Sequence, residues 1–159
     1  MHMVIAVDPG ANGAFVWSVD GFGVEARKMP DSDVEICELM AELSCKTKSV
    51  ALFLETPSMA GYGPKIPAAS IAKLQFNVGV IYGASVAMGW QVRRIDPKAW
   101  QRTHPVGKKA DHGSGWKKHL KARAKELFPQ TDVYDWNADA LLIYEIGRAS
   151  CRERVWTVV

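Results

Sequence analysis

Long apolar runs and cysteines are both scarce in this sequence. The most apolar stretch, residues 71–90, is interrupted by Lys73, Gln75 and Asn77, so it predicts a buried helix and not a membrane span. The three cysteines have no metal-ligand spacing and cannot all pair, which favours a reducing compartment. The residues show no secretory leader, repeat or low-complexity segment, and we expect a cytoplasmic protein.

Acidic residues are nearly absent from one segment, which runs from Arg93 to Lys125. It holds eleven Lys or Arg against two Asp and no Glu, while the whole chain of 159 residues carries a net charge of only +3. A concentrated basic run is typical of a surface that binds a polyanion, although a solvated helix face beside a loop gives the same pattern.

Short apolar runs alternate with longer amphipathic segments along the chain, and 48% of its residues are hydrophobic, enough for one core. This order predicts an α/β fold with a five-stranded mixed sheet flanked by helices. We expect strands at 3–8, 13–19, 24–29, 50–55 and 90–95, and helices at about 32–43, 68–88, 97–100, 116–128 and 135–144.

The C-terminal residues have an unusual composition. Residues 145–159, EIGRASCRERVWTVV, resemble a cloning or sequencing scar. We therefore predict one domain over residues 1–144 and a non-native or disordered tail over residues 145–159. A genuine basic C-terminus is the alternative.

Four carboxylates stand at the ends of predicted elements. Asp8 ends the first strand before a Pro-Gly turn, and Glu55 ends the fourth strand, where a buried charge needs a partner. Asp135 and Asp139 are four residues apart in the last predicted helix, so we expect them on one face. If the first and fourth strands are neighbours, all four meet and offer oxygen ligands to a hard divalent cation. Each residue also has a simpler explanation when it is considered alone. Asp8 could serve the tight turn that follows it, and Asp135 could be the N-cap of its helix.

Several segments of the chain resemble motifs of the RuvC-like resolvases, and they occur in the same order. The resemblance covers residues 3 to about 144 and is closer to the phage-type members than to the main bacterial resolvase. One position departs from many bacterial members, because Trp136 stands where they have an acidic residue or histidine three residues before the last Asp. The matching segments are Ile5–Gly10 with Gly13, Leu54-Glu55, Ile95–Trp100, Lys117–Pro129 and Asp135–Leu142.

The resemblance implies an RNase H-like fold and a metal-dependent crossover junction endodeoxyribonuclease that resolves Holliday junctions and other branched DNA. It implies phosphodiester hydrolysis with two Mg²⁺ or Mn²⁺ ions per active site. It also implies a homodimer whose two-fold symmetry matches a four-way junction, in a bacterial host cytoplasm if the sequence is phage-encoded. The family's catalytic and metal-ligand roles carry over to Asp8, Glu55, Asp135 and Asp139.

Basic and aromatic side chains supply candidate DNA contacts. Lys117 and Lys118 begin the helix beside the predicted metal site, where either could act in catalysis by holding the scissile phosphate. The loop after Glu55 carries Tyr62, a candidate for stacking on a base at the junction, although a tyrosine folded back on the surface is the alternative. The predicted DNA-binding residues are Met59, Tyr62, Lys65, Arg93, Arg94, Lys98, Arg102, Lys108 and Lys109.

Three other functions fit parts of the pattern. A different RNase H-like nuclease, acting on RNA or an RNA–DNA hybrid, would have the same metal chemistry. An actin-like ATPase lobe also opens with a strand ending in Asp, but it needs a second lobe and a second phosphate loop. An inactive DNA-binding module is disfavoured by four intact carboxylates.

Overall fold

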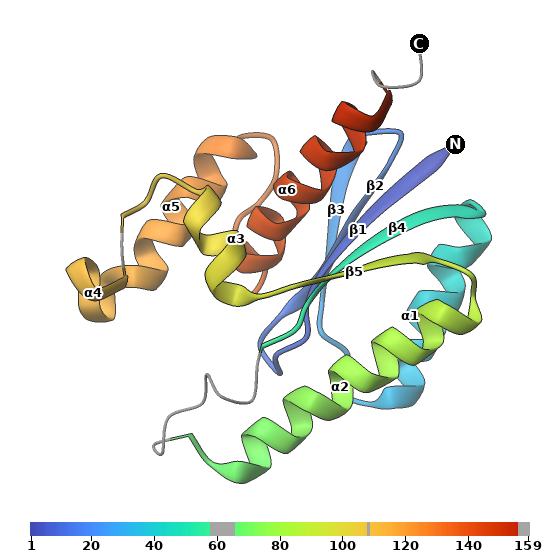
Figure 1. Ribbon diagram of the computed structural model, residues 1–159, viewed down its shortest axis with the longest axis horizontal. Helices are drawn as coiled ribbons and strands as arrows, with labels where there is room; N and C mark the ends of the chain where they lie inside the picture. Colours follow the sequence, from blue (N-terminus) through green and yellow to red (C-terminus); the bar gives the residue numbers. More distant parts are fainter. Residues whose placement is uncertain (58–65, 108, 156–159) are drawn as a thin grey trace.

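A mixed five-stranded sheet forms the centre of the protein (Figure 1). The computed structural model describes residues 1–57, 66–107 and 109–155. The strand order is β3-β2-β1-β4-β5; β1 is antiparallel to β2 and parallel to β4, which confirms the predicted sheet and the adjacency of the first and fourth strands. The strands are β1 (His2–Asp8), β2 (Ala14–Val19), β3 (Phe22–Lys28), β4 (Ser49–Glu55) and β5 (Gln91–Ile95).

Helices cover both faces of the sheet (Figure 1). α1 and α2 pack on one face, over Met3, Ile5 and Val7 of β1. α6, with α3 and α5 beside it, packs on the other face, over Val4 and Ala6. β1 is therefore buried on both sides, as its continuous apolar run predicts. The helices are α1 (Asp33–Lys46), α2 (Ala68–Ala87), α3 (Pro97–Thr103), α4 (Lys109–His112), η2 (Gly113–Gly115), α5 (Trp116–Leu127) and α6 (Ala138–Val155).

Two segments differ from the sequence prediction. The last helix begins at Ala138 and not at Asp135, because the Asn137 side chain accepts a hydrogen bond from the Tyr134 backbone and holds a turn ahead of the helix. Between the helices predicted at 97–100 and 116–128, the structure adds the short helices α4 and η2. Within the described ranges, no helix has both the length and the apolar character needed to cross a membrane.

The last helix continues past the predicted domain boundary at residue 144. Ile146 and Cys151 pack against the core, and the Gly147 backbone lies so close to Phe53 that an added Cβ would stand 2.7 Å from the ring. α6 thus runs to Val155, past the expected boundary. The division at residue 144 and the non-native or disordered character of residues 145–159 stay predictions.

Candidate active site

Three carboxylates meet where β1, β4 and α6 adjoin. The parallel register pairs Val7 with Leu54, so the next residues, Asp8 and Glu55, leave the sheet at the same edge. Asp139 lies in the first turn of α6, which packs across β1. The three groups are close enough to interact electrostatically: the charge of Asp8 raises the pKa of both Glu55 and Asp139, and the charge of Asp139 raises that of Glu55. We call Asp8, Glu55 and Asp139 the carboxylate cluster.

The turn after β1 fixes the Asp8 carboxylate. The backbone N–H of Gly10 donates to Asp8 Oδ1 at 3.0 Å, and the N–H of Gly13 donates to the Gly10 carbonyl at 2.8 Å. A Cβ on Gly13 would stand 2.1 Å from the Asp8 carbonyl oxygen and 2.8 Å from its carboxyl carbon. Real Cβ atoms do not approach that closely, so position 13 requires glycine for the chain to close around Asp8.

Glu55 is held by a tryptophan to which the sequence analysis assigned no role. The Trp100 side chain is 1% exposed, and its indole Nε1–H donates to Glu55 Oε1 at 2.8 Å. Asp96 caps α3 by accepting from the backbone N–H of Lys98 at 2.8 Å, which sets the helix that carries Trp100. An indole N–H can only donate, so a buried tryptophan needs an acceptor. That requirement is the signal that could have identified Trp100.

One of the two candidate lysines reaches the carboxylate cluster. Lys117 Nζ lies 3.7 Å from Asp139 Oδ2, and its side chain is 80% exposed. Its positive charge also acts on Asp8. Lys118 has no ion pair within residues 1–57, 66–107 and 109–155. The geometry therefore favours Lys117 as the cation of this site.

Burial and mutual repulsion make negative charge costly in the cluster. Burial, and then the charge of Asp8, raise the pKa of Glu55 to about 8, against a smaller opposing effect of the Trp100 hydrogen bond. The same two causes raise the pKa of Asp139 to about 6, although Lys117 opposes them. Burial also raises the pKa of Asp8, while the Gly10 hydrogen bond and Lys117 lower it. A bound cation would relieve this cost.

The donor chemistry of the cluster fits a hard divalent cation, but the side chains do not enclose one. Within the described part of the chain, no three His, Cys, Asp or Glu side chains form a group that could hold a metal ion. Carboxylate oxygens are nevertheless the ligands that Mg²⁺ selects, and Mg²⁺ commonly completes its shell with water and phosphate oxygens.

Asp135 lies apart from the cluster. Its side chain is 90% exposed and pairs with Lys121 at 2.8 Å, and that hydrogen bond lowers the pKa of Asp135. Because α6 begins at Ala138, Asp135 precedes the helix, and the expectation that Asp135 and Asp139 share one helical face is wrong.

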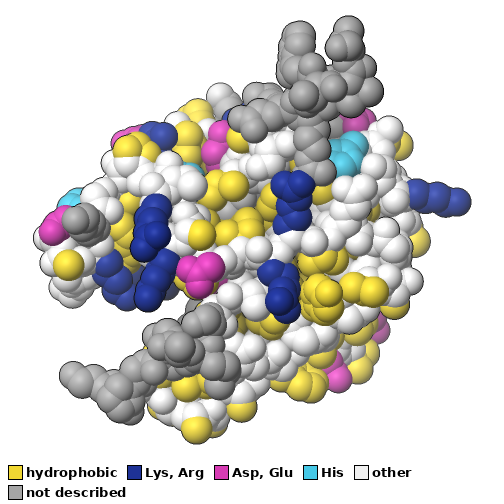
Figure 2. Space-filling model, in the orientation of Figure 1, with side chains coloured by type: hydrophobic (Ala, Val, Ile, Leu, Met, Phe, Trp, Pro, Cys, Tyr) yellow, Lys and Arg dark blue, Asp and Glu magenta, His cyan; other side chains and the backbone are white. Residues whose placement is uncertain are grey.

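The predicted DNA-binding residues fall into separate groups. Arg93 and Arg94 are exposed on β5, with their guanidinium groups over the rings of Phe53 and Tyr82. Lys98, Arg102 and Lys109 line one pocket between α3, α4 and α5, and Figure 2 shows Lys and Arg side chains gathered over that part of the molecule. The predicted contacts that lie outside the described residues are Met59, Tyr62, Lys65 and Lys108.

Two solved structures of RuvC from Thermus thermophilus are similar to the chain over nearly its whole length. The first, in complex with a Holliday junction substrate, has a TM-score of 0.66 and 15% sequence identity, and the match covers 96% of each chain. The second has a TM-score of 0.59 and 20% identity, over 95% of this chain and 96% of the other. No protein-family model and no curated protein sequence matches the chain. The likeness confirms the RuvC-like, RNase H-like α/β fold.

Proposed function

We propose that this chain, whose fold is RuvC-like, is a metal-dependent endonuclease that cuts branched DNA such as Holliday junctions. The observation that carries the proposal is the meeting of Asp8, Glu55 and Asp139 at one edge of the sheet, with Lys117 beside them. The basic surface over α3 to α5 supports a nucleic-acid substrate. The similar Thermus structure holds a Holliday junction, which supports the branched substrate.

In this proposal Asp8, Glu55 and Asp139 hold Mg²⁺ or Mn²⁺, and we propose two ions from the chemistry of phosphodiester hydrolysis. Bound divalent ions supply charge stabilisation at the phosphoryl group and activation of the attacking water. Asp135 is left out of the ligand set because its exposed carboxylate is paired with Lys121. The oxygen-rich donor set and its mutual repulsion support a divalent cation there.

The chain's own residues position the reacting groups. Trp100 holds Oε1 of Glu55 and so orients the Glu55 carboxyl group beside Asp8. Gly10 and Gly13 fix Asp8 at the end of β1. The ammonium group of Lys117 lies at the solvent-facing side of the cluster, where it can hold an oxygen of the scissile phosphate.

We also propose that α2 forms a homodimer interface. Phe76, Tyr82 and Val86 are apolar side chains of α2 and are 52%, 42% and 55% exposed. Exposed apolar side chains along one helix favour a protein partner, and a two-fold dimer would present two active sites to a four-way junction. Sedimentation of the wild type and of Val86→Glu tests this proposal; a monomeric wild type would contradict it.

A nicking assay on a synthetic four-way junction tests the nuclease proposal. We expect cleavage that requires Mg²⁺ or Mn²⁺, a loss of at least about 100-fold in Asp139→Asn, and near-wild-type cleavage in the matched Asp135→Asn variant. Asp8→Asn should abolish cleavage while junction binding survives. Equal losses in the two Asn variants at 135 and 139 would contradict the ligand set drawn from the structure.

The substrate is tested by giving the enzyme a four-way junction, a linear duplex and an RNA–DNA hybrid. Preference for the junction supports the proposal. Preference for the hybrid would replace it with an RNase H-type activity at the same carboxylates. Junction binding without any metal-dependent cleavage would leave a DNA-binding module.

A further inference from the structure

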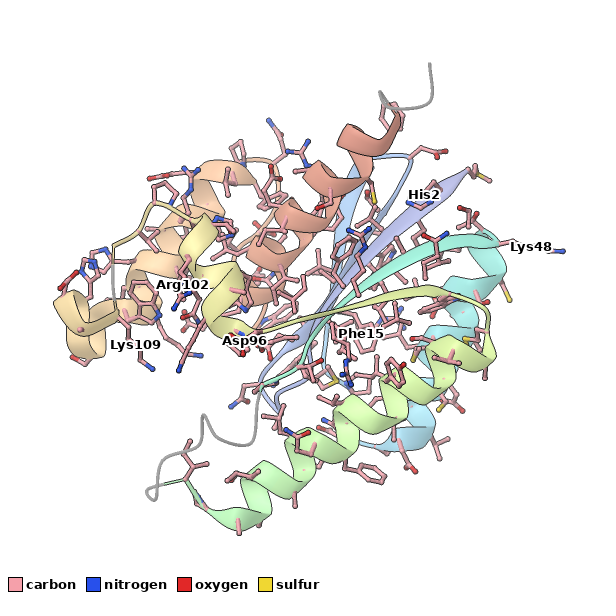
Figure 3. All side chains as sticks on the ribbon, in the orientation of Figure 1. His2, Phe15, Lys48, Asp96, Arg102 and Lys109 are labelled. Atoms are coloured by element: carbon pink, nitrogen blue, oxygen red, sulfur yellow. The ribbon has the colours of Figure 1, made fainter. Side chains whose placement is uncertain are left out.

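Two amide side chains of α2 bind the chain just beyond the strands that carry the carboxylate cluster. Figure 3 shows side chains of α2 filling the space between this helix and the sheet. Asn77 Nδ2 donates to the Pro9 carbonyl at 3.0 Å, and Gln75 Nε2 donates to the Pro57 carbonyl at 3.3 Å. Pro9 follows β1 directly, and Pro57 is the second residue after β4. One helix therefore contacts both chains where they leave the sheet.

Asn77 acts on Asp8 through a single peptide group. The Pro9 carbonyl, which accepts from Asn77, and the Gly10 N–H, which donates to Asp8 Oδ1 at 3.0 Å, belong to the same planar peptide. Rotation of that peptide would break both hydrogen bonds. A donor on the carbonyl also polarises the peptide and strengthens its N–H as a donor. Asn77 thus fixes the direction from which Gly10 holds Asp8.

The burial of Asn77 indicates that this contact is the role of its side chain. The residue is 0% exposed, and Val78 and Ile81, its buried neighbours on α2, are apolar. The Asn77 Oδ1 atom has no hydrogen-bond partner among the described residues. A buried amide that is only half satisfied costs free energy that an apolar side chain would not. Packing alone therefore gives no reason for an amide here, whereas the turn after Asp8 does.

Gln75 holds the second chain. The backbone N–H of Thr56, the residue after Glu55, donates to the Ile95 carbonyl of β5 at 2.8 Å. Gln75 then fixes the next residue, Pro57, from the other direction. Side chains two residues apart on a helix do not face each other, so Gln75 and Asn77 can reach different chains from one rigid element.

We propose that Asn77 and Gln75 are positioning residues for the carboxylate cluster, and that α2 limits how far Asp8 and Glu55 can move relative to one another. The proposal rests on the proposed function, because a fixed arrangement of these carboxylates serves the binding of a shared cation. Both amides donate to backbone carbonyls, so each acts through the main chain. Loss of either donor should loosen one ligand and leave the core intact.

The Gly10 amide proton reports on Asn77 without metal or DNA. Asn77→Leu keeps the size of the side chain and removes the donor. In NMR spectra of the full chain, we expect the Gly10 amide resonance to move upfield and its exchange with solvent to accelerate about 3–10-fold. Ser85→Ala is the matched control, because Ser85 is also fully buried on α2 but donates to the Ile81 carbonyl of its own helix at 2.7 Å. It should leave Gly10 unchanged.

Mn²⁺ binding by the full chain, followed by the EPR signal of the free ion, tests the effect on the cluster. We expect Asn77→Leu to weaken Mn²⁺ affinity about 10–100-fold and Gln75→Met, which removes a longer hydrogen bond, about 3–10-fold. Ser85→Ala should keep the wild-type affinity. Saturating Mn²⁺ should restore cleavage by both variants, which a damaged fold would not allow. Melting temperatures show whether each variant folds, and Gln75→Met decides the proposal if Asn77→Leu does not.

The outcomes separate the positioning role from the proposed function. Wild-type Mn²⁺ affinity in folded Asn77→Leu and Gln75→Met overturns the positioning role and leaves the nuclease intact. Lower affinity in both variants of a chain that never cuts DNA supports the positioning role and overturns the nuclease. A Gly10 amide that is the same in Asn77→Leu and in the wild type overturns the role of Asn77. A wild type that binds no Mn²⁺ overturns both proposals.

Discussion

Replacing Glu55 by glutamine should stabilise the metal-free protein, and the gain should depend on pH. Burial and the charge of Asp8 raise the pKa of Glu55 from 4.5 to about 8. A carboxyl with a raised pKa destabilises the fold when it is charged, so the cost is absent below pH 4.5 and complete above pH 8. Glutamine is never charged, and its carbonyl oxygen can still accept the Trp100 hydrogen bond.

The magnitude follows from the size of the pKa change. At about 1.4 kcal/mol for each pH unit, Glu55→Gln should gain up to about 5 kcal/mol at pH 9 and almost nothing at pH 4.5. In a domain of this size, even half of that gain would raise the melting temperature by roughly 5–10 °C. The wild type itself should lose stability as the pH rises through the same window.

Urea unfolding in EDTA between pH 4.5 and pH 9 measures this effect. The control is Glu38→Gln, an exposed position on α1, where we expect a change within about 0.5 kcal/mol at every pH. In a parallel series, Mg²⁺ should stabilise the wild type more than Glu55→Gln, because only the wild type presents the full charge to the ion. A Glu55→Gln variant that is less stable than the wild type at pH 9, or whose gain is the same at all pH values, would refute the reasoning.

Further predictions concern the residues that position the carboxylate cluster. Gly13→Ala should destabilise the protein by more than about 2 kcal/mol in urea unfolding, because its Cβ collides with Asp8, whereas Gly79→Ala, with open space around its Cβ, should stabilise α2 by about 0.5–1 kcal/mol. Trp100→Phe should fold but lower metal affinity about 10–100-fold. It should also move the pH profile of cleavage upward, because the Trp100 hydrogen bond lowers the pKa of Glu55 and its loss raises that pKa; an unchanged profile would contradict the positioning role. Lys117→Met should reduce the cleavage rate about 10–100-fold while Lys118→Met leaves it near the wild-type rate, and the reverse order in single-turnover assays would exchange their roles.

The sheet and the strand-end carboxylates could be predicted from sequence because they depend on local patterns. Five apolar runs predicted the five strands, and Asp8 and Glu55 directly follow two of them. The expected adjacency of β1 and β4 then sufficed to bring both side chains to one edge. Asp139 was also predicted to lie in the last helix, which it does, although in its first turn.

Residue roles that depend on contacts between elements could not be predicted from the sequence. Asp135 and Asp139 have helical spacing, yet the Asn137 turn delays the helix and leaves Asp135 to Lys121. Nothing in the spacing of Lys117 and Lys118 distinguishes the lysine that reaches Asp139. The acceptor of the Trp100 indole N–H is Glu55 on β4, so the sequence around Trp100 does not reveal its role. Tyr62 as a base-stacking residue, the two-ion count and a phage origin stay predictions.

The carboxylate cluster depends on the register in which β4 pairs with β1, whereas the hydrophobic core does not. Both strands carry apolar side chains on both faces of the sheet. Sliding one strand past the other by a single residue would therefore still bury apolar side chains on both faces. The same slip would turn Glu55 towards the opposite layer and away from Asp8. An insertion or deletion of one residue inside β4 is therefore expected to give a molecule that folds yet cannot assemble its acidic side chains.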